Sequence, residues 1–308
     1  MSFTSSVKLE VSKIENTPPE YISELSAIFK NIAVIEDDVK VTTENSNVAR
    51  RIFNLIKNIY GVNPSVTVRR GYNFNKNYIY IIEFKNNKEL VLENLDIIKN
   101  GIINETPSDY IIGDENLLKS YLRGLFLACG SINDPKKSRY HLEFVVDKEN
   151  YAKYVSKLLN RLDLNSKYLK RDNKYMIYVK ESEKISDFLK VIGATNAVMY
   201  FENIRAYRDQ KNMTNRLNNC EQANVDKMIE TANNQLKDIK LIKEEGLLDV
   251  LDERLKVVAI YREKYPEISL KDLSSIITIE TGDSITKSGL HHRLKKIHEI
   301  ANRIRKKD

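Results

Sequence analysis

The 308-residue sequence contains few cysteines, glycines and prolines. Its two cysteines, Cys129 and Cys220, lie far apart, so they supply neither a disulfide framework nor the close spacing of a zinc site. With only 10 glycines and 6 prolines, we expect few long irregular loops. These absences fit a folded protein of a reducing compartment.

Long hydrophobic runs are also absent. No stretch of about 18 uninterrupted apolar residues occurs, and residues 1–13 lack the apolar segment that follows basic residues in a signal peptide. The sequence therefore predicts a protein that neither spans a membrane nor is exported. We expect a cytoplasmic location without membrane contact.

Positive charge is concentrated at one end of the sequence. The whole chain carries a net charge of +7 at pH 7. Residues 285–308 hold eight Lys or Arg against Glu299 and Asp308, which accounts for nearly all of that excess. A local basic excess is typical of segments that bind phosphate backbones, and a solvated basic tail is the alternative.

The first two-thirds of the sequence contain an internal repeat, in which residues 23–33 align with residues 120–130. After this helix, each copy has β-like, amphipathic and β-hairpin segments and then a closing helix. The segments are 39–43, 48–60, 65–69, 78–84 and 90–99 in the first copy, and 140–146, 150–162, 167–170, 175–180 and 185–192 in the second. We interpret both copies as α-β-β-α-β-β-α units, which together predict a pseudo-symmetric α+β domain.

Small residues mark one face of the repeated helix. They are Gly124, Ala128 and Gly130 in the second copy, with Ala27 and Ala33 at matching positions in the first. Small side chains let two helices approach closely, so this face predicts a helix–helix seam between the copies. An ordinary buried helix has the same periodicity.

After residue 193 the sequence becomes polar and helical. We assign residues 1–212 to a first domain, with repeats at about 20–100 and 115–195, and residues 213–308 to a helical second domain. A long amphipathic linker helix should end near Gly246, a natural C-cap. Three shorter helices then form a helix-turn-helix domain at about 250–308, one over 252–264, one N-capped by Ser269 and one from near Thr286.

The last helix has the pattern that a DNA-recognition helix needs, with an apolar stripe to anchor it and a polar, basic face to present. The predicted DNA-binding residues are Lys287, Ser288, His291, His292, Arg293, Lys295 and Lys296. Better placed for phosphates are Arg293, Arg303, Arg305, Lys306 and Lys307. The connection from Thr278 to Ile285 is longer than the simplest turn of this motif, and a helical cap domain with a solvated face is the alternative.

The histidines also raise the question of a metal site. His291 and His292 are adjacent, so they diverge by about 100° on a helix, and no cluster of carboxylates and histidines is expected around His298. The sequence therefore predicts no metal and no cofactor.

Three strings resemble segments of known families. Residues 122–130, LRGLFLACG, resemble the LAGLIDADG motif of homing endonucleases, whose motif helices pair at a central seam. Together with NRLNNCEQAN at 215–224 and TKSGLHHRLKKI at 286–297, they make the chain similar over essentially its full length to the WhiA family. That resemblance implies a degenerate LAGLIDADG domain joined to a helix-turn-helix similar to sigma-factor region 4. It also implies control of transcription of bacterial cell-division genes and, in spore formers, sporulation genes.

The LAGLIDADG resemblance bears on catalysis. Those endonucleases hold a divalent metal with a carboxylate at the penultimate position of each motif, where this sequence has Ile32 and Cys129. An isoleucine cannot ligate a metal, and a lone thiol is a poor ligand for Mg²⁺. The nearby acids fall beyond the motif ends, where turns are expected: Glu36, Asp37, Asp38 and Asp134. We therefore predict no nuclease activity.

The hairpins of the first domain carry basic residues with interleaved aromatics, so DNA contact and protein interaction both remain open for this domain. The residues are Arg69, Arg70, Tyr72, Phe74, Lys76, Lys136, Lys137, Arg139, Tyr140, Lys167, Lys170, Arg171 and Lys174. For the whole chain we expect a nucleoid-associated monomer that binds double-stranded promoter DNA. The alternative is a protein-interaction scaffold acting through RNA polymerase, a sigma factor or another regulator, and an active nuclease is less favoured.

Overall fold

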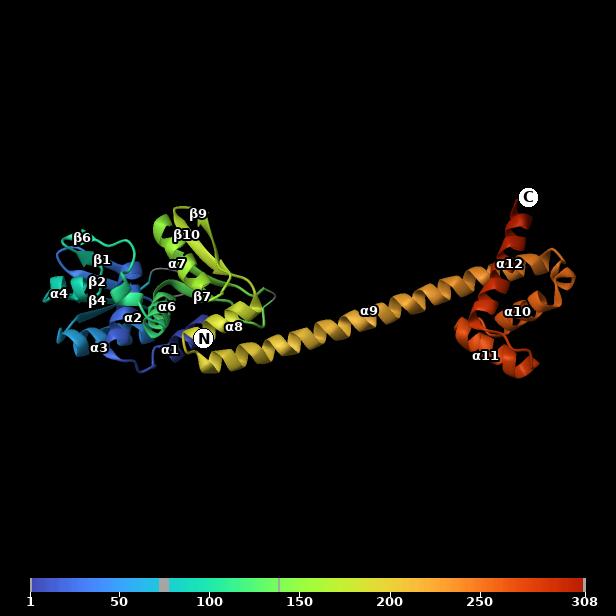
Figure 1. Cartoon of the computed structure of the whole chain (residues 1–308), viewed down its shortest axis with the longest axis horizontal. Coiled ribbons are helices and arrows are strands. Elements are labelled where there is room, and N and C mark those ends of the chain that lie inside the picture. The colour runs from blue at the N-terminus through green and yellow to red at the C-terminus, as the bar shows by residue number, and fades with distance from the viewer. Residues whose placement is uncertain (1, 72–77, 138, 307–308) are drawn as a thin grey trace. The chain divides into compact units, whose positions relative to one another are not determined.

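The computed structural model describes residues 2–71, 78–137 and 139–306 (Figure 1). Tyr72, Phe74, Lys76 and Lys307, named above, lie outside these residues. The chain divides into two compact units, residues 1–209 and 210–308, and each is described by itself.

The first unit contains two repeats of the same element order (Figure 1). The first repeat consists of α2 (Pro18–Ile32), β1 (Ala33–Ile35), β2 (Val39–Thr43), α3 (Ser46–Tyr60), β3 (Ser65–Arg70), β4 (Tyr78–Phe84) and α4 (Lys88–Asn94). The second consists of α6 (Glu115–Cys129), β7 (Gly130–Ile132), β8 (Leu142–Val146), α7 (Glu149–Arg161), β9 (Lys167–Arg171), β10 (Lys174–Val179) and α8 (Ser182–Val191). The predicted α-β-β-α-β-β-α order is confirmed in both copies.

Each repeat forms a four-stranded antiparallel sheet with equivalent strand orders, β1-β2-β4-β3 and β7-β8-β10-β9. The strands β1 and β7 continue directly from the ends of α2 and α6. Sequence periodicity did not locate these two strands, because three residues are too few to show an alternating pattern.

The helix α3 shows how local sequence produces these elements. The side chain of Asn45 accepts hydrogen bonds from the backbone N–H groups of Asn47 and Val48, which caps the first turn. Gly61 ends the helix in the left-handed region, with φ 64°. Between the caps, Ile52 and Ile56 are fully buried. Each such side chain contributes about 1.5–3 kcal/mol to folding, so the helix is stable through packing of one face.

The two repeats meet where α2 packs against α6. A Cβ atom on Gly124 would lie 2.1 Å from the carbonyl oxygen of Glu24 and 3.0 Å from the Cβ of Ala27. No side chain fits at position 124 without moving the backbone of the facing helix. The predicted helix–helix seam is confirmed, and glycine is required at its closest point.

A buried carboxylate ties the seam to its surroundings. Glu24 is fully buried; its carboxylate accepts hydrogen bonds from both Nε and Nη2 of Arg51, the latter at 2.7 Å, and lies 3.7 Å from Nη1 of Arg123. Arg123 also donates from Nε to the carbonyl oxygen of Ile192, at 3.0 Å. Burial lowers the pKa of Arg123, an effect that the charge of Glu24 opposes. One carboxylate therefore holds α2, α3 and α6 together.

Several elements lie outside the predicted repeats. The helix α1 (Phe3–Val11) attaches to the edge of the second sheet, because the Thr4 hydroxyl donates to the carbonyl oxygen of Ile132 at 2.8 Å and accepts from its N–H at 3.0 Å. Between the repeats lie the short strands β5 (Ile98–Lys99) and β6 (Ile102–Ile103) and the helix α5 (Asp109–Ile112).

The predicted closing helix over residues 90–99 is wrong at its C-terminal end, since α4 stops at Asn94. Asp96 adopts a left-handed backbone with φ 55°. Its carboxylate accepts hydrogen bonds from Asn104 Nδ2 at 2.9 Å and the Ser108 N–H at 2.6 Å. These contacts, made with residues further along the chain, end the helix and start the segment between the repeats.

The second unit is helical. The helix α9 (Thr195–Glu244) is continuous across the division between the units, and it is followed by η1 (Leu248–Val250), α10 (Glu253–Lys264), α11 (Leu270–Thr281) and α12 (Lys287–Arg305). Gly246 follows α9 with φ 69°, as its predicted capping role requires. The core of this unit is formed by Ile239, Ile242, Val258, Ala259, Leu273, Ile277, Ile285, Leu290, Leu294, Ile297 and Ala301. Within the described residues, no helix is long and apolar enough to cross a membrane.

Replacing Glu24 with glutamine tests the buried carboxylate. We expect Glu24→Gln to lower the free energy of unfolding of the first unit by about 3–5 kcal/mol, because two buried guanidinium groups lose their counter-charge. Urea denaturation followed by circular dichroism measures the change. The matched control is Glu115→Gln, whose exposed pair with Lys119 should contribute at most about 1 kcal/mol. Equal losses in the two variants would contradict the assignment.

Candidate nucleic-acid interface

The helix α12 begins at a well-formed cap. The hydroxyl of Thr286 accepts a hydrogen bond from the N–H of Gly289 at 3.1 Å, and the first turn contains no acidic residue. Leu290, Leu294 and Ile297 are at most 3% exposed, so the predicted apolar stripe faces the core. The opposite side of the helix therefore faces solvent.

The seven predicted DNA-binding residues lie on this helix. Six of them are exposed and Arg293 is half-buried; the exposed ones are Lys287, Ser288, His291, His292, Lys295 and Lys296. In the part of the chain that the structure describes, no hydrogen bond or ion pair engages these seven side chains. Free cations next to a helix N-terminus, whose backbone N–H groups carry partial positive charge, form a surface suited to phosphate and base contacts.

The turn before α12 is shorter than predicted. The helix α11 continues to Thr281 and ends at Gly282, which is left-handed with φ 78°, so the predicted connection from Thr278 to Ile285 is wrong. The Thr278 hydroxyl donates to the carbonyl oxygen of Ser274 at 2.9 Å and accepts from the Ile285 N–H at 3.1 Å. This double role of Thr278 extends α11 and holds the following turn against it.

One ion pair holds α11 to α10, and a buried arginine holds the loop that precedes α11. The ammonium group of Lys264 lies 2.9 Å from the carboxylate of Glu280, which also accepts a hydrogen bond from the Tyr265 hydroxyl at 3.0 Å. Arg262 is 1% exposed and donates from Nη1 to the carbonyl oxygen of Ile268 at 2.8 Å, and burial lowers its pKa. The helices α10 and α11, joined in this way, both pack against α12.

Asp238 of α9 anchors the other half of α12. Its side chain is 4% exposed and lies 2.6 Å from Nδ1 of His298 and 2.6 Å from Nη2 of Arg305. A carboxylate therefore lies beside His298, and Arg305, which we expected to be better placed for phosphates, pairs with this same carboxylate while its side chain remains 42% exposed. The spacing of His298 and Arg305 places both residues on one face of α12, and this was the only sign of the contact in the sequence. Their partner could not be identified from sequence, because Asp238 lies about 60 residues away.

The degenerate motif positions lie at the ends of the seam helices, Ile32 as the last residue of α2 and Cys129 as the last of α6. The ammonium group of Lys8 donates to the carbonyl oxygen of Leu127 at 3.0 Å, and burial lowers its pKa to about 8. Burial also raises the pKa of the Cys129 thiol to about 12, so the thiol is protonated at neutral pH.

The acids near the motif ends lie in turns. Residues 36–38 form the bend between β1 and β2, and Asp134 follows β7. A search of residues 2–71, 78–137 and 139–306 finds no group of three His, Cys, Asp or Glu arranged to hold a metal ion.

Replacing Asp238 with asparagine tests the anchor of α12. We expect Asp238→Asn to destabilise the second unit by about 1–3 kcal/mol, a modest loss because His298 and Arg305 are about half-exposed and can be rehydrated. Hydrogen exchange of α12 amides measures the loss directly. Asp226→Asn, at an exposed position of the same helix α9, should leave the exchange unchanged. Unchanged exchange in both variants would show that Asp238 does not anchor α12.

Comparisons with known proteins cover both units. The model of the WhiA N-terminal LAGLIDADG-like domain matches residues 22–98, that of the WhiA LAGLIDADG-like domain matches residues 118–211, and that of the WhiA C-terminal HTH domain matches residues 214–301. The three matches together span most of the chain.

Relatives and solved structures agree with these matches. The chain is 39% identical over 312 residues to the probable cell division protein WhiA of Enterococcus faecalis, covering 100% of this chain and 99% of the relative. It is 42% identical over 310 residues to the protein of the same name from Staphylococcus haemolyticus, covering 99% and 98%. A crystal structure described as "full-length DUF199/WhiA from Thermatoga maritima" superposes with a TM-score of 0.60 at 26% identity, covering 98% of this chain and 99% of that one. The chain belongs to the WhiA family.

Proposed function

We propose that this protein is a sequence-specific DNA-binding regulator of transcription that acts on cell-division genes and, in a spore-forming host, on sporulation genes. One observation carries the proposal: the first turns of α12 present exposed Lys, Ser and His side chains that have no hydrogen-bond or ion-pair partner among the described residues, on a helix that is anchored along its opposite side. The names of the relatives, probable cell division protein WhiA, support the choice of target genes.

The chemistry of the exposed side chains fits a major groove. Lysine donates to guanine O6 and N7, serine and histidine can donate or accept, and a single α-helix fits the width of the groove. Lys287, Ser288 and His291 lie in the first turns, where a recognition helix contacts base edges, and Lys295 follows one turn later. The half-buried Arg293 and the exposed Arg303 then serve the phosphates at the sides.

The first unit, in our proposal, does not cleave DNA. An isoleucine and a protonated thiol occupy the positions where LAGLIDADG endonucleases place carboxylates. Neither group supplies the oxygen ligand that Mg²⁺ requires. The repeats would then serve as a binding or positioning module, and the protein would act at the nucleoid as a monomer.

A protein partner is the second candidate for how the first unit acts. The strand β3, at the edge of the first sheet, exposes all six of its residues, and Val66 and Val68 are 47% and 52% exposed. Exposed apolar residues on an unpaired sheet edge favour contact with another protein chain. RNA polymerase, a sigma factor or another regulator would be the partner.

Charge-matched variants test DNA binding by α12. Genome-wide mapping of bound sites identifies a promoter fragment, and a gel-shift titration then measures affinity for it. We expect Lys287→Ala/Lys295→Ala to weaken binding at least about tenfold and to reduce the slope of log affinity against log salt by about 1 for each lost phosphate contact. The control Lys227→Ala/Lys240→Ala removes two exposed charges of α9 and should retain near-normal affinity.

Two outcomes would contradict the proposal. Equal losses of DNA affinity in the α12 and α9 variants would show that binding depends on the net charge of the protein and not on α12. Unchanged genomic occupancy of a variant with Lys287, His291 and Lys295 all replaced by alanine would show that a protein partner recruits the chain to its sites.

A cleavage assay tests the absence of nuclease activity. We expect no nicking of supercoiled plasmid by the purified chain in Mg²⁺ or Mn²⁺, because positions 32 and 129 lack oxygen ligands. Metal-dependent nicking that disappears in Asp134→Ala would overturn this prediction. Nicking that persists in Asp134→Ala would indicate a contaminating nuclease, which repurification should remove.

A further inference from the structure

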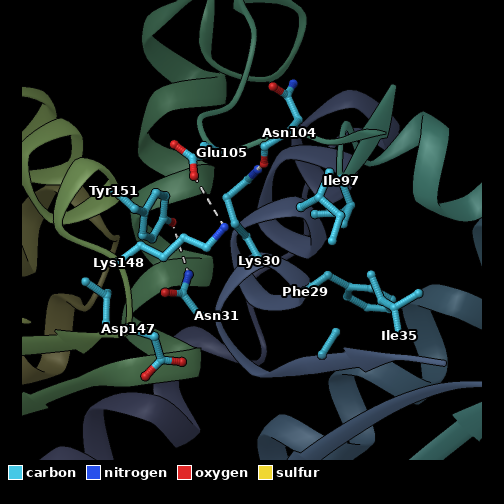
Figure 2. Close-up of a pocket in the computed structure, with 13 residues that line it drawn as sticks. Phe29, Lys30, Asn31, Ile35, Ile97, Asn104, Glu105, Asp147, Lys148 and Tyr151 are labelled. Atoms are coloured by element: carbon cyan, nitrogen blue, oxygen red, sulfur yellow. Dashed lines mark hydrogen bonds and ion pairs between the residues drawn. The ribbon is translucent and has the colours of Figure 1, made fainter. Parts of the chain in front are cut away.

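A cavity lies between the two repeats of the first unit. Its volume is about 250 Å³. The lining comes from the end of α2 and from β1 in the first repeat, from the end of β8 and the start of α7 in the second, and from residues 97–105 of the segment between the repeats. Figure 2 shows Phe29, Ile35 and Ile97 on one side of the cavity, and Asn31, Lys148 and Tyr151 on the other. The cavity thus has an apolar wall and a polar wall, as sites for small organic molecules do.

Lys30 places a cation at this cavity without a carboxylate in contact. Its ammonium group donates one hydrogen bond, to the carbonyl oxygen of Asn104 at 2.6 Å. No ion pair to Lys30 occurs among the described residues. The acid with the largest effect on it, Asp96, already accepts hydrogen bonds from Asn104 and Ser108. An ammonium group has three donors, so Lys30 has donors to spare beside the cavity.

Burial changes the pKa of Lys30. Desolvation lowers the pKa of Lys30 to about 8, an effect that Asp96 opposes and the nearby Lys148 reinforces. The group is still mainly protonated at pH 7. A partly buried cation that has no carboxylate in contact among the described residues is stabilised when an anion binds beside it.

The rim of the cavity limits the charge of the ligand. The ammonium group of Lys148 lies 3.4 Å from the carboxylate of Glu105. The side chain of Lys148 is 58% exposed and that of Glu105 is 50% exposed, so Lys148 can turn from Glu105 to a bound anion. Asp147 pairs with Lys174 at 3.1 Å. Because Glu105 and Asp96 are close to Lys30, a second negative charge on the ligand would be repelled. These charges favour a monoanion over a dianion such as a phosphate monoester.

The amide and hydroxyl groups of the polar wall are already engaged. Asn31 donates from Nδ2 to the carbonyl oxygen of Ala27 at 2.7 Å and to the Tyr151 hydroxyl at 3.1 Å. The Tyr151 hydroxyl also shares a hydrogen bond of 2.7 Å with that of Tyr121. Recognition of an anion in this cavity therefore depends on the two lysines.

We propose that this cavity is a binding site for a small organic monocarboxylate, held between the ammonium groups of Lys30 and Lys148 with its apolar part against Phe29 and Ile97. Because the site contacts both repeats and the segment between them, a bound carboxylate would stabilise the pairing of the repeats. This site is independent of the DNA-binding role proposed for α12.

Calorimetric titration of the full chain with three carboxylates, propionate, isobutyrate and benzoate, and with their three neutral amides tests the proposal. We expect at least one carboxylate to bind below about 10 mM, at least tenfold more tightly than its amide. The affinity for the carboxylate should fall about tenfold per pH unit above pH 8, because Lys30, whose ammonium group binds the carboxylate, is then losing its proton. Failure of all three carboxylates, or equal binding of acid and amide, would overturn the proposal.

Variants assign the binding to the cavity. Lys30→Met should lose at least tenfold in affinity for the carboxylate that binds, while Lys157→Met, at an exposed position of α7, should retain it. Thermal unfolding checks that Lys30→Met is folded. Should that variant not fold, Lys148→Met on the rim should still lose severalfold in affinity. Full affinity in whichever of the two lysine variants is folded would place the ligand elsewhere and refute the site.

Discussion

The structure of the first unit depends on the close approach of α2 and α6 around Gly124. A side chain at this position would collide with the backbone of the facing helix. The approach buries the carboxylate of Glu24, which would be costly on its own, and Arg51 and Arg123 compensate for that cost because they reach the same carboxylate from α3 and α6. Such a network is stabilising only when it is complete, so the helix seam, the third helix and the loop at Ile192 are coupled to one another.

The two ends of the seam show how a symmetric fold becomes asymmetric. In the second repeat, Lys8 of α1 donates to the last turn of α6, and Thr4 attaches α1 to the edge of β7. In the first repeat, Lys30 belongs to α2 itself, and the chain that covers it comes from the segment between the repeats. Because these covering segments differ, a cavity lies beside α2, and the cation of Lys30 at that cavity has no ion-pair partner among the described residues. Both motif positions, Ile32 and Cys129, pack partly buried against the core, and neither carries an oxygen ligand for a metal, which is the reason we propose binding instead of hydrolysis.

The second unit divides its basic residues into two groups. Arg262 and Arg305 are used within the unit, where they bond a carbonyl oxygen and a buried carboxylate, respectively. The basic side chains in the first turns of α12 have no partner among the described residues, and they face solvent. Anchored cations hold the helix, and free cations are available to a polyanion. A charge total alone does not distinguish the two groups, although they have different consequences for binding.

Local sequence was sufficient for the helices and longer strands of both repeats, although not for locating β1 and β7. It was also sufficient for the helices with strong caps and for the apolar stripe of α12, because periodicity and capping act over a few residues. The resemblance in LRGLFLACG, NRLNNCEQAN and TKSGLHHRLKKI together was sufficient for the family. What only the tertiary structure decided are contacts between distant residues: Asp238 beside His298, Asp96 ending α4, Glu24 between two arginines, and Lys30 at a cavity. The residues in these contacts are far apart in sequence, and no helix or strand periodicity relates their positions. They come together only when the folded chain packs.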